Sequence, residues 1–122
     1  MPWTVRFASE FEREFLALAS PVQTELLARA RLLGKFGPET GRPWADVLKG
    51  SRFANMKELR FRAGGGIWRV AFAFDPLRQA ILLVAGNKAG RAEGRFYRSL
   101  IKRADARYAS HLGSLAAGEV GV

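Results

Sequence analysis

The 122-residue sequence contains no cysteine and only one histidine, His111. Disulfide bonds, thiolate metal ligands and a cysteine nucleophile are therefore excluded. A metal centre would have to be built from scattered carboxylates around one imidazole, so we expect neither a metal site nor a cofactor. The place of His111 near the end of the last predicted helix is typical of a capping or surface residue.

Long hydrophobic runs are also absent. The longest apolar stretch, 80–86, is far shorter than the roughly 20 residues needed to span a bilayer, so we expect no membrane partner. The N-terminus goes directly into a strand-like pattern and lacks the apolar core of a signal peptide. These features favour a cytoplasmic protein. With 48% apolar residues, we expect one domain over 1–113 and a flexible tail over 114–122.

Acidic residues are few compared with basic ones. Eleven Asp and Glu stand against 20 Lys and Arg, which gives a formal net charge of +9 at pH 7. A polyanion is the natural partner of such a chain. Nucleic acid, an anionic membrane surface and an acidic protein all fit this description, and charge alone does not choose among them.

The first half of the chain predicts one strand and two helices. Residues 3–7 alternate apolar and polar side chains, which is the pattern of a half-buried strand. Helical spacing of apolar residues follows over 9–18, and a second helix opens at Pro21. The segment 37–51 is rich in Gly and Pro and predicts a long irregular loop.

The second half predicts three strands and a final helix. Alternating residues over 56–62 and 67–74 and an apolar run over 79–85 predict the strands, the last of them central in the sheet. Helical spacing returns over 95–112. The element order β-α-α-β-β-β-α indicates an α+β fold in which helices pack on an antiparallel sheet.

Basic side chains recur on one predicted face of the sheet. The alternation places Arg60, Arg62 and Arg69 on that face, and we expect Lys88 and Lys57 nearby. A concave cationic surface of this kind suits a phosphodiester backbone. The small residues that flank Arg69 along its strand indicate open space around it, which favours a functional role. For Arg60, pairing with a carboxylate such as Glu58 or Glu93 is the slightly stronger interpretation.

RNA cleavage is chemically possible without histidine. The reaction needs activation of the 2′-oxygen, stabilisation of charge on the pentavalent phosphorus and protonation of the leaving 5′-oxygen. Arg and Lys can supply the second of these, and a cluster of cations could depress the pKa of a lysine enough to make it a base. Tyr97 lies on the apolar stripe of the last helix, where a core role and a role in base stacking or proton transfer are equally compatible with the pattern.

Several short segments together resemble a known family. They are Lys49-Gly50, Met56–Arg60, Ile67–Val70, Leu82–Gly86 followed by Lys88, and Arg95–Tyr97. Their order and spacing resemble the phage-derived, RelE/HigB-like toxins of type II toxin–antitoxin systems, over roughly residues 3–112. The resemblance implies a microbial-ribonuclease-type fold and metal-independent cleavage of mRNA in the ribosomal A site. It also implies a neutralising antitoxin, often with a helix-turn-helix domain.

The resemblance suggests roles for individual residues. Arg69 matches the phosphate-stabilising arginine of the family, Lys88 a basic position near the reacting phosphate, and Tyr97 an aromatic residue that begins the last helix. Lys57 and Arg60 match basic positions of the second strand. The expected catalytic set is therefore Arg69, Lys88, Tyr97 and Lys57, and the expected RNA-binding set is Arg60, Arg62, Arg91 and Arg95. Glu58 stands where some relatives place a catalytic lysine, so the general base stays open.

Two other functions fit the same pattern. ParE-type toxins are similar in fold but act on DNA gyrase and need a docking surface in place of a base. A non-catalytic nucleic-acid-binding module would bind RNA in a salt-sensitive manner without cutting it. Direct cleavage of RNA distinguishes the ribonuclease from both.

Overall fold

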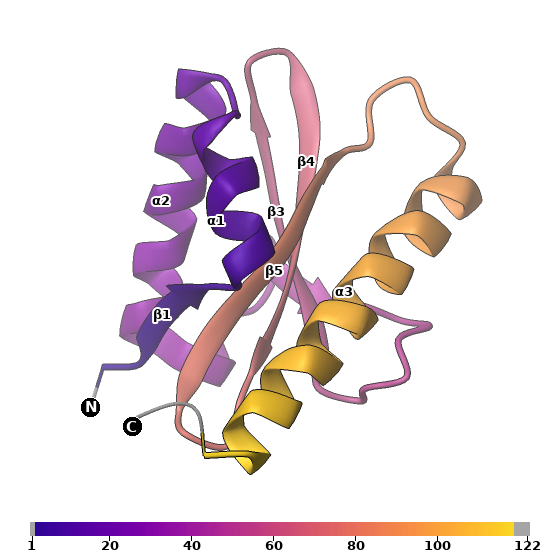
Figure 1. The fold of residues 1–122 in the computed structure, drawn as a ribbon. Helices are drawn as coiled ribbons and strands as arrows, with labels where there is room; N and C mark the ends of the chain where they lie inside the picture. Colours follow the sequence, from indigo (N-terminus) through magenta and orange to yellow (C-terminus); the bar gives the residue numbers. More distant parts are fainter. Residues whose placement is uncertain (1, 119–122) are drawn as a thin grey trace.

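The computed structural model describes residues 2–118, which form five strands and three α-helices (Figure 1). In chain order they are β1 (Thr4–Phe7), α1 (Ser9–Leu16), α2 (Ser20–Phe36), the 3-10 turn η1 (Gly37–Glu39), β2 (Ala45–Val47), β3 (Met56–Ala63), β4 (Gly66–Phe74), β5 (Gln79–Asn87) and α3 (Glu93–Ala116).

The five strands form one sheet with the order β1-β5-β4-β3-β2. Strands β2 to β5 pair antiparallel with their neighbours, whereas β1 pairs parallel with β5. The α+β prediction is confirmed, but a purely antiparallel sheet is wrong, because β1 pairs parallel with β5. The helices α1 and α2 follow β1 in sequence, so no hairpin turn forces β1 to pair antiparallel. Period-2 alternation predicts a strand and says nothing about the direction of its partner.

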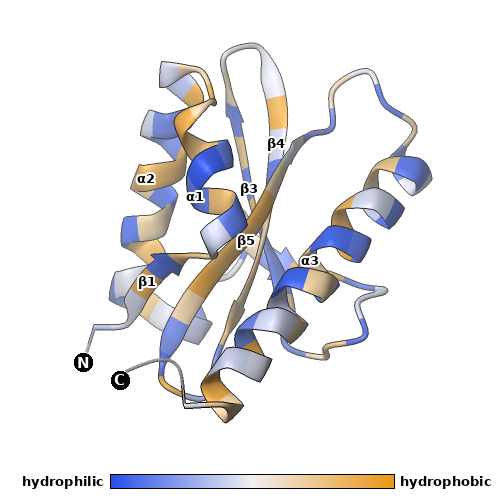
Figure 2. Cartoon of the chain, in the orientation of Figure 1, coloured by the Kyte–Doolittle hydropathy of each residue, from blue (hydrophilic) through white to orange (hydrophobic). Residues whose placement is uncertain are grey.

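Helices cover both faces of this sheet. Figure 1 shows α1 and α2 on one side and α3 on the other. The central strand β5 is buried from Ala80 to Val84, as its apolar run predicted, and is among the most hydrophobic segments in Figure 2. No described helix is long and apolar enough to cross a membrane.

The small residues of β4 and β5 let α3 approach the sheet closely. A Cβ atom at Gly86 would lie 2.8 Å from the Phe96 ring of α3. Ala71 and Ala73 are fully buried on the same face. The expectation of an open face around Arg69 is therefore wrong: the alanines provide room for a helix, and Arg69 itself is only 7% exposed.

Two segments differ in secondary structure from their predictions. The loop predicted over 37–51 contains η1 and the short strand β2, which adds an edge to the sheet beside β3. Gly37 adopts a positive φ of 57° at the end of α2, and the Trp3 ring packs where a Cβ would stand. At the C-terminus, residues 114–116 of the predicted tail continue α3, while residues 119–122 lie outside the described part.

Candidate functional site

Two arginines face each other across β3 and β4. Arg60 is the direct cross-strand partner of Arg69, so two like charges stand side by side on the sheet. Such pairs destabilise a sheet unless an anion lies between them. The available carboxylates are only loosely placed, with Glu58 Oε1 3.7 Å from Arg69 Nε and Asp46 Oδ2 3.8 Å from an Arg60 guanidinium nitrogen. The local arrangement therefore favours binding of a further anion.

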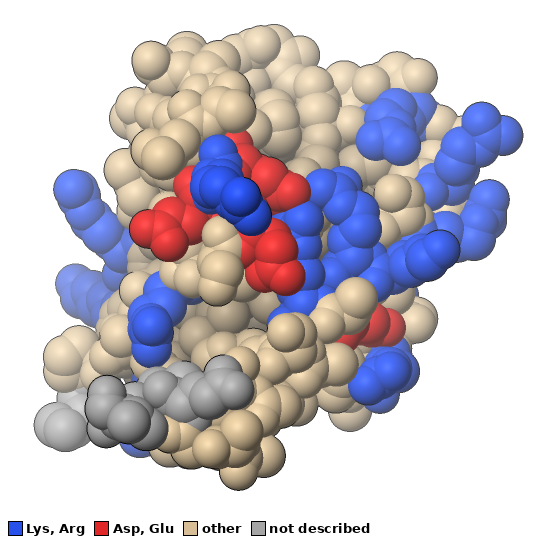
Figure 3. Space-filling model, viewed as in Figure 1, with Lys and Arg blue, Asp and Glu red and all other residues tan. Residues whose placement is uncertain are grey.

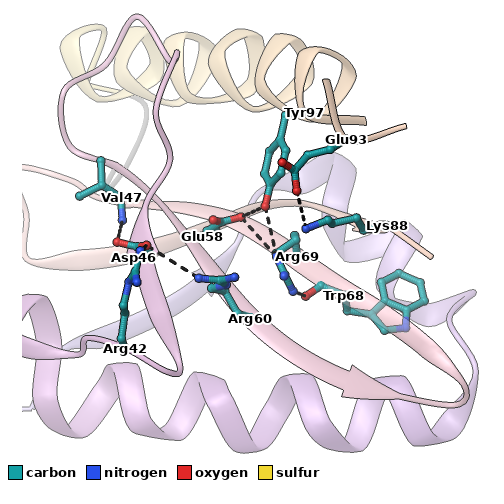
Figure 4. Close-up of polar contacts among 10 residues, drawn as sticks. All are labelled: Arg42, Asp46, Val47, Glu58, Arg60, Trp68, Arg69, Lys88, Glu93 and Tyr97. Atoms are coloured by element: carbon teal, nitrogen blue, oxygen red, sulfur yellow. Dashed lines mark hydrogen bonds and ion pairs between the residues drawn. The ribbon is translucent and has the colours of Figure 1, made fainter. Parts of the chain in front are cut away.

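A tyrosine from α3 completes the cluster around Arg69 (Figure 4). The Tyr97 hydroxyl donates a hydrogen bond of 2.9 Å to Glu58 Oε1 and accepts one of 3.2 Å from Arg69 Nε. A guanidinium nitrogen of Arg69 also donates to the Trp68 carbonyl at 3.0 Å. These bonds hold Glu58, Arg69 and Tyr97 in one fixed constellation, to which β3, β4 and α3 contribute one residue each.

The protonation of this constellation is set mainly by burial. Burial raises the pKa of Glu58, although the hydrogen bond from Tyr97 and the charge of Arg69 act to lower it. Burial also raises the pKa of Tyr97, so its hydroxyl stays protonated at neutral pH. The site thus combines a carboxylate of increased basicity with a phenolic proton donor.

Asp46 of β2 forms ion pairs with two arginines, Arg42 and Arg60, at the rim of the cluster. Arg42 donates two hydrogen bonds to Asp46 Oδ2, at 2.9 and 2.7 Å, and the backbone N–H of Val47 donates to Oδ1 at 2.8 Å. The hydrogen bonds from Arg42 and Val47 lower the pKa of Asp46. This carboxylate therefore stays charged and keeps Arg42 close to Arg60.

Lys88 lies just beyond β5, on the other side of Tyr97. Its ammonium group forms an ion pair of 2.8 Å with Glu93 and lies 5.7 Å from the centre of the Tyr97 ring. The hydrogen bond and the charge of Lys88 lower the pKa of Glu93. Because Glu93 is exposed, its side chain can swing away and release Lys88 at little cost.

Two adjoining grooves expose this cluster to solvent. The first, which we call the tyrosine groove, has a volume of about 340 Å³ and is lined by Arg42, Asp46, Val47, Leu48, Lys49, Glu58, Arg60, Lys88, Glu93 and Tyr97. The second, which we call the arginine groove, has a volume of about 400 Å³ and is lined by Arg42, Pro43, Arg60, Phe61, Arg62, Ile67 and Arg69. Figure 3 shows Lys and Arg side chains gathered on the side of the molecule where α3 begins.

The structure brings together most of the predicted site residues. Arg60, Arg69, Lys88 and Tyr97 lie around the two grooves, and Arg62 lines the arginine groove. Lys57 does not join them.

Lys57 lies on the opposite face of the sheet, because it is one residue away from Glu58 in an alternating strand. Its ammonium group donates to the Pro38 carbonyl at 3.2 Å and lies over the Phe74 ring.

The two predicted RNA contacts near α3 do not line either groove. Arg91 is exposed and stacks on the Phe96 ring, with its guanidinium carbon 5.3 Å from the ring centre. Arg95 is exposed in the first turn of α3.

Three residues of the site were not predicted as functional. Glu58 carried a usable signal, since the alternation of β3 places it on the same face as Arg60. Arg42 and Asp46 come from a segment without periodicity, so only the pairing of β2 with β3 places them at the site.

His111 has a structural role that the sequence did not predict. Its Nε2 atom lies 2.8 Å from Asp75 Oδ2, and its ring stacks on Tyr108. This contact ties the turn between β4 and β5 to α3. Within residues 2–118, no three His, Asp or Glu side chains are grouped so as to hold a metal ion.

The fold is that of a small RelE-type α+β protein. It is similar to the structure of a mutant of the Escherichia coli toxin RelE in the free state, with a TM-score of 0.60 and 16% sequence identity, over 84% of this chain and 96% of that one. The sequence profile of the family described as Phage derived protein Gp49-like (DUF891) matches residues 13–109. The chain therefore belongs to this family.

Two relatives come from Mycobacterium tuberculosis. The toxin HigB3 is 46% identical over 105 residues, which cover 86% of this chain and 90% of HigB3. The toxin HigB2 is 49% identical over 88 residues, which cover 71% of this chain but only 43% of HigB2. The resemblance to RelE/HigB-like toxins drawn from the sequence is confirmed.

Proposed function

We propose that this protein is the toxin of a type II toxin–antitoxin pair and cleaves messenger RNA on the ribosome. The observation that carries this proposal is the constellation of Glu58, Tyr97 and Arg69 where two cationic grooves adjoin. It offers a base, a proton donor and a phosphate-binding cation within one hydrogen-bonded cluster. Similarity to the HigB toxins supports the same function.

In the proposed reaction, the 2′-oxygen of a ribose attacks the adjacent phosphorus and the bond to the 5′-oxygen breaks. Glu58 accepts the proton of the 2′-hydroxyl, for which its raised pKa makes it better suited than an exposed carboxylate. The products are a 2′,3′-cyclic phosphate and a new 5′-hydroxyl end. The carboxylate thus occupies the position of general base that the sequence left open.

The remaining steps are charge stabilisation and protonation of the leaving group. Arg69 and Lys88 place positive charge beside the phosphorane oxygens. Tyr97 donates its proton to the leaving 5′-oxygen and regains one from Glu58 through their 2.9 Å hydrogen bond. Protein side chains fill all three roles, so the proposed cleavage needs no metal ion.

The proposed partners follow from this activity. An antitoxin, with or without a helix-turn-helix domain, would neutralise the toxin, and the ribosome would present the mRNA. Both interactions would occur in the cytoplasm. Arg91 and Arg95 remain predicted RNA contacts. They lie at the N-terminal end of α3 and are close to Lys88 in sequence.

A cleavage assay on translating ribosomes tests the proposal. Purified protein is added to ribosomes programmed with a defined mRNA, and new 5′ ends are mapped by primer extension. We expect cuts that require the ribosome and that Arg69→Lys and Lys88→Ala greatly reduce. Lys102→Ala, which removes an exposed charge from the middle of α3, should cut like the wild type.

The outcomes separate the rival functions. Growth arrest in cells without mRNA cuts, together with inhibition of DNA supercoiling, would identify a ParE-type gyrase poison. RNA binding with neither cuts nor growth arrest would identify a binding module. Either result would refute the ribonuclease proposal.

A further inference from the structure

The arginine groove contains more positive charge than the proposed cleavage step uses. Four of its lining residues are arginines and none is acidic. Arg62 is exposed at the outer end of β3, and in the part of the chain that the structure describes no carboxylate lies within ion-pair distance of it. The groove thus has a concave cationic surface that the neighbouring carboxylates of Asp46 and Glu58 neutralise only in part.

The geometry of β3 places these charges in a row. Glu58, Arg60 and Arg62 alternate along one face of the strand, so successive side chains stand about 7 Å apart. This interval is comparable to the separation of neighbouring phosphates in an extended RNA strand. The Arg69 side chain reaches along the sheet toward Glu58, with its Nε atom 3.7 Å from the Glu58 carboxylate. With the reacting phosphate at Glu58, the next phosphates along the strand therefore reach Arg60 and then Arg62.

Asp46 shows that the middle position of this row can bind an anion. Arg42 and Arg60 both direct guanidinium nitrogens at the same carboxylate oxygen, Asp46 Oδ2, with Arg42 at 2.7 Å and Arg60 at 3.8 Å. The Arg42 side chain is 75% exposed, so it can also reach an oxygen from outside the protein. A phosphate oxygen is similar in charge and hydrogen-bonding geometry to this carboxylate oxygen.

We propose that the arginine groove is a binding subsite for the phosphodiester backbone of single-stranded RNA on one side of the cleaved bond. Arg42 and Arg60 bind the neighbouring phosphate, and Arg62 binds the one beyond it. The two grooves share Arg42 and Arg60, so one strand can run through both without a break. This subsite rests on the proposed function for its position relative to the cleaved bond, whereas its affinity for RNA does not.

An acidic protein segment is the other polyanion that could occupy the groove. The row of arginines along β3 and its continuity with the tyrosine groove favour RNA, because a nucleic-acid backbone carries charges at regular intervals. The test below therefore uses both an RNA and an acidic peptide as probes.

Binding of a non-cleavable RNA to the purified protein tests the subsite. The probe is a fluorescent 2′-O-methyl oligouridylate of about six nucleotides, a length within the range of single-strand binding sites. A 2′-O-methyl dinucleotide serves as the short comparison. The variants are Arg42→Ala and Arg62→Ala. The control is Arg31→Ala, which removes the same charge from an exposed position on α2, on the opposite side of the sheet.

We expect Arg42→Ala and Arg62→Ala each to weaken binding of the longer RNA by about tenfold, the effect of one charge-assisted contact. Each should also reduce the steepness of log K against log salt by about 0.7, the contribution of one phosphate on a single strand. Arg31→Ala should leave the steepness unchanged. Dinucleotide binding should be insensitive to Arg62→Ala, because the dinucleotide does not extend to that residue.

Three results would overturn the subsite. The first is a longer RNA that binds Arg42→Ala and Arg62→Ala as it binds Arg31→Ala. The second is a loss of affinity in Arg62→Ala that is equal for both RNA lengths. The third is a polyglutamate peptide whose binding both variants abolish while RNA binding is retained, which would assign the groove to an acidic protein. Absence of ribosomal cleavage with the expected binding pattern intact would refute the proposed function and leave the subsite standing.

Discussion

The two tyrosines of this chain offer a matched test of the proposed chemistry. Tyr97 donates to the Glu58 carboxylate and accepts from Arg69, whereas Tyr108 lies further along α3 and contacts the Phe74 carbonyl at 3.2 Å and Asn55 at 3.3 Å. Replacing either residue with phenylalanine removes one oxygen and keeps the ring. The two variants therefore differ in which hydrogen bonds are lost and change little in packing.

The structure sets the expected size of each effect. Loss of a hydrogen bond to a buried carboxylate should destabilise Tyr97→Phe by about 2 kcal/mol, and loss of neutral bonds should destabilise Tyr108→Phe by about 1 kcal/mol. For a chain of 122 residues, each kcal/mol lowers the Tm by about 4 °C. Thermal melting measures both shifts, and both proteins should remain folded at assay temperature.

The two variants should differ much more in cleavage rate than in the free energy of unfolding. Loss of a general acid should slow the single-turnover cleavage rate of Tyr97→Phe by about 10²-fold to 10⁴-fold. Tyr108→Phe should cleave at the wild-type rate. The Tyr97 hydrogen bond also lowers the pKa of Glu58, so its loss should move the acidic limb of the pH–rate profile to higher pH.

Two results would refute this reasoning. Wild-type cleavage by Tyr97→Phe would remove Tyr97 from the reaction. Equal losses of cleavage in the two variants, in proportion to their loss of stability, would show that the Tyr97 hydroxyl only supports the fold.

Three further predictions concern the stability of the fold and the activity of the site. His111→Ala removes a hydrogen-bond partner of the fully buried Asp75 side chain and should cost about 1–3 kcal/mol in urea unfolding. Burial alone would raise the pKa of Asp75, but the hydrogen bonds from His111 and other groups lower it overall. The ionised Asp75 therefore stabilises the fold above the ordinary aspartate pKa, and this contribution to the free energy of unfolding is lost as the pH falls through the lowered pKa. In His111→Ala, acid unfolding should therefore begin at a higher pH, and an unchanged onset would contradict the assigned contact. Glu58→Gln should abolish cleavage. Because the pKa of Glu58 is raised in the folded protein, the wild type should lose stability as the pH rises above 4.5. Glu58→Gln should not show this loss, and unfolding measurements at several pH values would detect the difference. Gly86→Ala should force the Phe96 ring away from β5, lower stability by about 1–3 kcal/mol and reduce cleavage; an unchanged melting curve would mean that α3 does not pack as tightly as described.

The sequence by itself determined the local elements and the chemistry that they carry. Apolar periodicity depends on neighbours along the chain, so it predicted the α+β class, the central position of β5 and the shared face of Arg60 and Arg62. Composition determined the excess of positive charge, and the order and spacing of short segments along the chain were enough to reveal the resemblance to HigB-like toxins. All of these properties are local or additive.

Tertiary structure alone decided which distant residues meet. β1 lies parallel to β5 because of how the crossover through α1 and α2 packs on the sheet, whereas the turn at Gly64 and Gly65 sets the register that places Arg60 opposite Arg69. Tyr97 reaches Glu58 because α3 packs onto the small residues of the sheet, which the sequence had suggested to be an open surface. The crossover of β1 and the docking of α3 depend on packing between segments far apart in the chain, and no periodic pattern within one segment carries that information.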